Sequence, residues 1–157
     1  MLALILLAMA FAYFYLQLVL GLPPCPLCIV DRFALVLTGV TLLMNLSLVH
    51  YFRKAERRIG LFSCFLNFVW LGLGIWASIR HIMLQYFPSA QGGCLPYAND
   101  TLIDLLTSAF AGTSDCGVVL WTLGGFSIAE QTFMLFVLLF ILNCRLLYNL
   151  KGYHNKL

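Results

Sequence analysis

The chain has 157 residues, of which 62% are hydrophobic and only 10% are charged, and its mean hydropathy is +0.96. Soluble domains have about 45–50% apolar and about 25% charged residues, so this composition excludes an ordinary soluble protein. It also excludes a disordered chain, which lacks apolar surface to bury. The net charge of +3 is small and gives no reason to expect a nucleic-acid partner. The composition indicates a small integral membrane protein.

Four apolar runs predict four membrane-spanning helices within a single domain, 1–157. A span needs about 20 apolar residues, and helices satisfy every backbone polar group within lipid. Pro23 and Pro24 end the first run, since proline cannot continue a helical hydrogen-bond ladder. The expected fold is an all-α bundle of four transmembrane helices, with approximate spans 2–22, 28–49, 61–79 and 130–148.

The distribution of charge predicts the orientation of the bundle. Seven basic residues and one acid fall in the loop 50–60 or after residue 144, whereas two basic residues and five acids fall on the other side. Basic residues favour the cytoplasmic side. We therefore expect both termini, the loop 50–60 and the tail 149–157 in the cytoplasm. The loops 23–27 and 80–129 then lie outside.

The outer loop 80–129 is long enough to be functional. Apolar residues at helical spacing between 102 and 110, with Asn99 or Asp100 as a cap and Gly112 just beyond, predict a short amphipathic helix. It fits a helix lying on the membrane surface better than one that binds a partner, although the apolar stripe alone suits both.

Six cysteines divide into two groups. Cys64 and Cys144 fall inside predicted spans, where we expect them to pack as small hydrophobic residues. The other four lie on the outer side and allow three pairings. Zinc binding and structural disulfides are the alternatives. Zinc sites usually use paired Cys-x-x-Cys knuckles, which the last two of these four cysteines do not form. Four helices embedded in lipid do not need disulfides for stability. Electron transfer by thiol–disulfide exchange is favoured for these four: Cys25, Cys28, Cys94 and Cys116.

The pair Cys25 and Cys28 forms a C-x-x-C motif, the spacing of redox-active dithiols. Pro26 is suited to the first turn of the second helix, which places Cys28 where the helix dipole favours an anion. Arg32 lies four residues later on the same face and favours the thiolate further. A charge this close to hydrocarbon is functional by default, although an interfacial anchor neutralised by Asp31 is the simpler interpretation.

These motifs together resemble the bacterial disulfide bond formation protein B family. The run from Cys25 to Arg32 (CPLCIVDR) resembles its first periplasmic loop. The run from His81 to Ser89 (HIMLQYFPS), with Cys94 after it, resembles the segment that follows its third span. Its second loop ends much as this one does, in Thr113-Ser114-Asp115-Cys116 and Trp121.

The resemblance implies a quinone-dependent thiol–disulfide oxidoreductase of the inner membrane. Its partner would be a periplasmic thioredoxin-like dithiol oxidase of the disulfide protein A type, whose thiolate attacks a Cys94–Cys116 disulfide at Cys94. Cys116 would then attack Cys25, and the freed Cys28 would engage the quinone, either ubiquinone or menaquinone. The resemblance implies that Arg32 and His81 bind the quinone and that no residue binds a metal.

Two other readings of the sequence remain open. A vitamin K epoxide reductase-like quinone reductase also has four spans and a C-x-x-C, but there the motif is expected near the last span rather than after the first. A non-enzymatic membrane protein, either stapled by disulfides or handling metal, would leave both cysteine pairs without redox function. Scattered methionines without paired Met or His motifs do not favour copper handling.

Overall fold

The computed structural model describes residues 1–21, 25–52, 56–87, 119 and 121–152. Four of its helices are long and apolar enough to cross a membrane: Leu2–Val19, Pro26–Tyr51, Arg58–Tyr86 and Ile128–Leu150. The predicted four-span helical bundle is confirmed, and the protein is a multi-pass membrane protein. The amphipathic helix expected at 102–110 lies outside the described residues.

The first span joins two kinds of helix. Helix α1 (Leu2–Ala10) continues as a π-helix, η1 (Phe11–Val19), in which the amide of Leu20 still bonds to the carbonyl of Tyr15, five residues earlier. Gly21 follows with a φ of +64°, a left-handed conformation that glycine adopts without strain. The helix therefore ends three residues before the predicted boundary at residue 22.

The second helix, α2 (Pro26–Tyr51), begins at the proline that the sequence indicated. Cys25 is its N-cap residue, and the Cys25 sulfur accepts a hydrogen bond of 3.2 Å from the amide of Cys28. Pro26 occupies the first helical position, where no amide hydrogen is needed. Cys28 therefore lies in the first turn, at the positive end of the helix dipole.

The third helix, α3 (Glu56–Tyr86), extends well beyond the predicted span 61–79 at both ends. Its last turns carry Ile82, Met83 and Leu84, and the next helix-breaking residue in the sequence is Pro88. The first seven residues of the predicted outer loop 80–129 are therefore helical. Where the membrane surfaces cross these helices stays a prediction.

A short hairpin leads into the last helix. Strands β1 (Thr122–Leu123) and β2 (Phe126–Ser127) pair antiparallel around Gly124 and Gly125, whose φ angles of +61° and +88° suit a tight turn. Helix α5 (Ile128–Gly152) then begins with a reciprocal cap. Ser127 Oγ accepts from the amide of Glu130, and Glu130 Oε2 accepts from the amide of Ser127.

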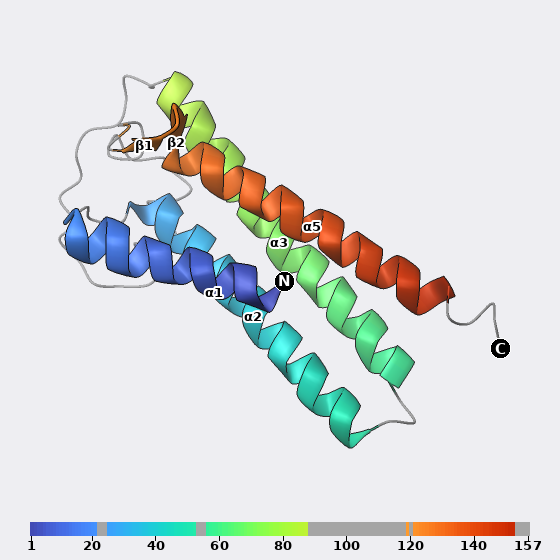
Figure 1. Ribbon diagram of the computed structural model, residues 1–157. Coiled ribbons are helices and arrows are strands. Elements are labelled where there is room, and N and C mark those ends of the chain that lie inside the picture. Colours follow the sequence, from blue (N-terminus) through green and yellow to red (C-terminus); the bar gives the residue numbers. More distant parts are fainter. Residues whose placement is uncertain (22–24, 53–55, 88–118, 120, 153–157) are drawn as a thin grey trace.

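Helix α3 is central to the bundle and packs against α2 and α5, while α1 packs against α2 (Figure 1). Between α3 and α5 the approach is close: a Cβ added at Gly74 would lie 2.2 Å from the ring of Phe136. The buried side chains are apolar and polar alike, and the outward faces carry many large hydrophobic side chains, as expected for helices in lipid. The buried core cluster consists of Ile5, Ala34, Leu35, Leu42, Leu71, Phe136 and Leu139.

The two cysteines within the spans differ in environment. Cys64 is 1% exposed, so its expected packing role is confirmed. Cys144 is exposed on α5, beside Arg145 and Tyr148, so the same expectation is wrong for that residue. The helical phase places Cys144 next to, rather than on, the α5 face that contacts α3, where Asn143 lies fully buried.

Candidate functional site

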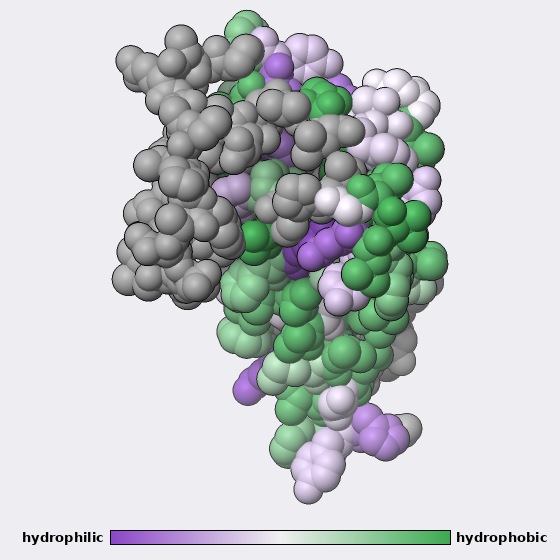
Figure 2. All heavy atoms as spheres, turned by 90° about the vertical axis from the view of Figure 1, so that its left-hand side faces the viewer, coloured by the Kyte–Doolittle hydropathy of each residue, from purple (hydrophilic) through white to green (hydrophobic). Residues whose placement is uncertain are grey.

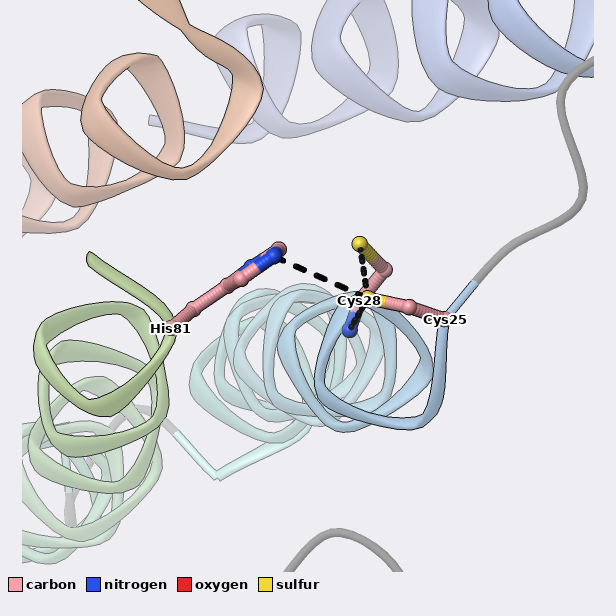
Figure 3. Close-up of side chains that lie close together, drawn as sticks. All are labelled: Cys25, Cys28 and His81. Carbon is pink, nitrogen blue, oxygen red and sulfur yellow. Dashed lines mark hydrogen bonds between the residues drawn. The ribbon is translucent and has the colours of Figure 1, made fainter. Parts of the chain in front are cut away.

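The start of α2 and the end of α3 bring a sulfur pair and a histidine together. The sulfur atoms of Cys25 and Cys28 are 2.7 Å apart, and Nε2 of His81 lies 3.8 Å from the Cys25 sulfur. Figure 3 shows the His81 ring reaching from α3 toward the first turn of α2. His81 is 5% exposed, so its ring is almost fully shielded from solvent.

This geometry suits reversible disulfide chemistry. A disulfide bond is about 2.05 Å long, so a small movement of either side chain would join the two sulfur atoms. The amide of Cys28 and the positive end of the helix dipole stabilise negative charge on the pair. Leu27 and Ala77 are fully buried beside it, with Val30 and Leu84 packed against them, which keeps the inner side of the site apolar.

Arg32 lies one helical turn after Cys28 and links α2 to the π-helix. Its guanidinium donates a hydrogen bond of 2.9 Å to Gln17 Oε1 and one of 3.2 Å to the carbonyl oxygen of Ala12. A guanidinium carries five N–H donors, so these two bonds leave further donors for a ligand. Nothing in the sequence pattern marked Gln17, because a lone glutamine in an apolar span has no distinctive spacing.

The simpler interpretation of the sequence, in which Asp31 neutralises Arg32, is not what the structure shows. Adjacent residues on a helix point in different directions, and the side chain of Asp31 turns toward α3. There, Oδ1 lies 3.3 Å from Ser78 Oγ. Asp31 is only 4% exposed, and Ser78 is fully buried.

The two remaining predicted site residues, Cys94 and Cys116, lie outside the described residues. After them, the ring of Trp121 lies 5.8 Å from that of Phe11 and 6.0 Å from that of Tyr15, centroid to centroid. The end of the outer loop therefore contacts the π-helix.

The described site also offers three ligand atoms for a metal ion. The sulfur atoms of Cys25 and Cys28 and a ring nitrogen of His81 lie within 4.8 Å of one another. Two thiolates and one imidazole form a ligand set that zinc accepts. The prediction that no metal is bound therefore needs a direct test.

Similarity to known proteins decides the family. The sequence profile described as "Disulfide bond formation protein DsbB" matches residues 1–146, nearly the whole chain. The chain belongs to the DsbB family. The protein called disulfide bond formation protein B in Psychrobacter arcticus is 36% identical over 154 residues, covering 90% of this chain and 82% of that protein.

A second relative, the protein of the same name in Saccharophagus degradans, is also 36% identical to this DsbB-family chain, over 80% of it and 76% of the relative. No solved structure matches the chain. Membership of the DsbB family supports a role in disulfide bond formation and an oxidoreductase activity. In the vitamin K epoxide reductase type the C-x-x-C motif is expected near the last span. In this chain the Cys25–Cys28 pair lies at the start of α2, the second span, which does not fit that type.

Proposed function

We propose that this protein oxidises a periplasmic thioredoxin-like dithiol oxidase and passes the electrons, through two cysteine pairs, to a membrane quinone. The observation that carries the proposal is the close approach of the Cys25 and Cys28 sulfur atoms, beside His81, at the start of one of four apolar helices. Family membership supports the thiol–disulfide part of this activity. The quinone and the partner are part of the proposal.

The residues around the sulfur pair fit a quinone. An oxidised quinone has hydrogen-bond acceptors but no donors, so its site must supply donors in apolar surroundings. Arg32 has N–H donors beyond those held by η1, and buried Leu27 and Ala77 line the helices near the sulfur pair. A quinone, when bound, supplies the acceptor that takes up two electrons and two protons.

Each residue near the pair has a distinct part in this scheme. Cys28 would carry the negative charge, because the Cys25 thiol donates to its sulfur and it lies at the positive end of the α2 dipole, and it would be the sulfur that reacts with the acceptor. Cys25 exchanges with the outer cysteine pair, and its sulfur closes the disulfide with Cys28 as the electrons leave. Arg32 orients the acceptor with its guanidinium, and His81 is the second contact on that side.

The outer pair completes the relay in the proposal. Cys94 receives the partner's thiolate, and Cys116 passes the electrons to Cys25, as the family resemblance implies. The partner's oxidation and this protein's reduction exchange one disulfide for another, so no external oxidant is needed before the last step. This arrangement requires the inner membrane, with the α2 start facing the periplasm and both termini in the cytoplasm.

Anaerobic stopped-flow mixing tests the proposed function. Purified protein in detergent is mixed with ubiquinone or menaquinone and a reduced thioredoxin-like dithiol protein, and quinone absorbance is followed. We expect rapid loss of the quinone band, no turnover with Cys28→Ser, and normal turnover with Cys64→Ala, whose thiol is buried elsewhere. No quinone reduction by the unaltered protein would contradict the proposal.

Metal analysis distinguishes the metal-handling alternative. The protein as purified should contain less than one zinc per chain. Added Zn²⁺ should inhibit by capturing the reduced Cys25–Cys28–His81 group, and a chelator should restore turnover. Stoichiometric zinc whose removal abolishes activity or unfolds the protein would instead favour a metal site.

A further inference from the structure

Asp31 is a buried acid at the proposed redox site with no role in the scheme above. It lies one helical turn after Cys28, on the side of α2 that faces α3, and is 4% exposed. Within the part of the chain that the structure describes, its carboxyl has one hydrogen-bond partner, Ser78 Oγ at 3.3 Å. Burying a charged carboxylate at the end of a membrane bundle is energetically costly. The structure must therefore explain when Asp31 carries a proton and when it is charged.

The hydroxyl of Ser78 allows two arrangements of that proton. Ser78 Oγ also lies 2.9 Å from the carbonyl oxygen of Gly74, one turn earlier on α3. A hydroxyl has one hydrogen and two acceptor positions. When Ser78 donates to the closer Gly74 carbonyl, Asp31 can bond to Ser78 only by donating its own proton, as a neutral acid. When the hydroxyl turns to Asp31, it donates to a carboxylate.

The charges around Asp31 favour an exchange between these two states. Cys28 and Arg32 flank it on α2, and the Arg32 guanidinium is directed to η1. On α3, Ser78 faces it directly, His81 lies about one turn further along, and Arg80 lies about half a turn from Ser78. Two negative charges one turn apart in a poorly hydrated site disfavour each other, so thiolate and carboxylate are not expected together.

We propose that Asp31 stores the proton of Cys28 and thereby keeps one negative charge at the site. In the reduced state the charge is on the Cys28 sulfur, Cys25 is a thiol and Asp31 is a neutral acid. In the oxidised state the sulfurs form a disulfide and the charge is on Asp31. This inference rests on the proposed function for its acceptor.

The protons and electrons balance in each half of the cycle. When the Cys25–Cys28 bond forms, two electrons leave, and two protons follow them to the quinone oxygens, one from the Cys25 thiol and one from Asp31. When the partner's dithiol becomes a disulfide, it releases two electrons and two protons. The electrons break the Cys25–Cys28 bond through the exchange relay, and the protons return to Cys25 and Asp31.

Infrared difference spectroscopy of the protein alone tests this assignment without quinone. Reducing the Cys25–Cys28 disulfide with a phosphine should produce a carboxylic-acid carbonyl band that shifts in D₂O. The band should be absent in Asp31→Asn, moved in Asp31→Glu and unchanged in Glu130→Gln, a control acid in the first turn of α5. A missing band, or one that persists in Asp31→Asn, would overturn the proposal.

Kinetics provide the second readout. Asp31→Asn keeps a polar group for Ser78 and should lower kcat for quinone reduction about a hundredfold, the low end of general acid–base effects, with the quinone KM changed less than twofold. Asp31→Glu should recover most of the rate. A change in KM alone, or full activity in Asp31→Asn, would refute proton storage. If the unaltered protein reduces no quinone, the proposed function fails, and the infrared result still decides the state of Asp31.

Discussion

The guanidinium of Arg32 is held by two acceptors on η1, Gln17 Oε1 and the carbonyl oxygen of Ala12. These bonds fix the side chain in one orientation beside the sulfur pair, and they also join α2 to the first span. A variant of Arg32 itself would therefore lose an acceptor-binding group and a helix contact at once. Gln17 offers a way to change only the orientation.

Substituting Gln17→Leu should raise the quinone KM by up to about tenfold with kcat nearly unchanged. The lost hydrogen bond to a charged group contributes about 1.5 kcal/mol, which corresponds to roughly that factor. Steady-state quinone reduction measures it. Gln17→Glu, which keeps an acceptor, should behave like the unaltered protein, and so should Tyr13→Phe on the same helix. An unchanged KM in Gln17→Leu would mean that Gln17 does not position Arg32.

Helices α3 and α5 show how a single glycine sets the distance between two elements. A Cβ at Gly74 would lie 2.2 Å from the ring of Phe136, whereas a Cβ at Gly72, half a turn away, would meet nothing within 4 Å. Real Cβ atoms do not approach this closely, so the aromatic ring would have to move in a tightly packed core.

Gly74→Ala should therefore lower the free energy of unfolding by about 1–3 kcal/mol, the usual cost of overpacking. Gly72→Ala adds the same methyl group to the same helix and should be neutral or stabilise by up to about 1 kcal/mol. Thermal unfolding in detergent compares the two. Combining Gly74→Ala with Phe136→Leu should recover part of the loss. Equal stability of Gly74→Ala and Gly72→Ala would contradict the role of the close contact.

The elements that sequence predicts well are those set by local chemistry. Hydropathy identifies four spans, and Pro26 marks the start of α2, because length, apolarity and a missing amide hydrogen act within one segment. The helix ends are less predictable. Helix α3 continues to Tyr86 because no helix-breaking residue precedes Pro88, and hydropathy does not record where a helix ends beyond its apolar stretch.

The side-chain partners at the candidate site depend on how helices pack, and the sequence does not encode this in any spacing. Asp31 and Arg32 are adjacent, yet one bonds to α3 and the other to η1. Gln17, Ser78 and the proximity of His81 to Cys25 follow from the same packing. The expectation for Cys144 is wrong because burial in a span depends on which face of α5 meets α3.

In the molecule as a whole, Cys25, Cys28 and His81 lie at one end of the bundle. At this end α2 begins, α3 ends and α5 begins (Figure 1). Figure 2 views the molecule from that side and shows hydrophilic described residues among hydrophobic ones. In the proposed function, electrons would enter from the soluble partner and leave to the quinone at this same end.

The order of the relay predicts the behaviour of Cys94→Ser. This variant should not oxidise the dithiol partner, because the attacked sulfur is gone, but it should still form the Cys25–Cys28 disulfide when quinone is present. Alkylation of remaining thiols followed by mass spectrometry measures both. The double substitution of Cys64→Ala and Cys144→Ala should leave turnover intact. Normal partner oxidation by Cys94→Ser would reverse the proposed order.

The cap at the start of α5 has a consequence for how the bundle responds to its lipid. Ser127 and Glu130 cap each other, Tyr86 donates to Glu130, and Ser127 donates to Gln85, so hydrated polar groups tie α3 to α5 at the redox end. These groups resist entry into hydrocarbon, which fixes the depth of that end. Adjustment to a thinner bilayer must then occur by tilting or at the opposite end, around Gly60 and Leu150. We therefore expect the sulfur pair to keep a constant distance from the aqueous boundary across membranes of different lipid chain length.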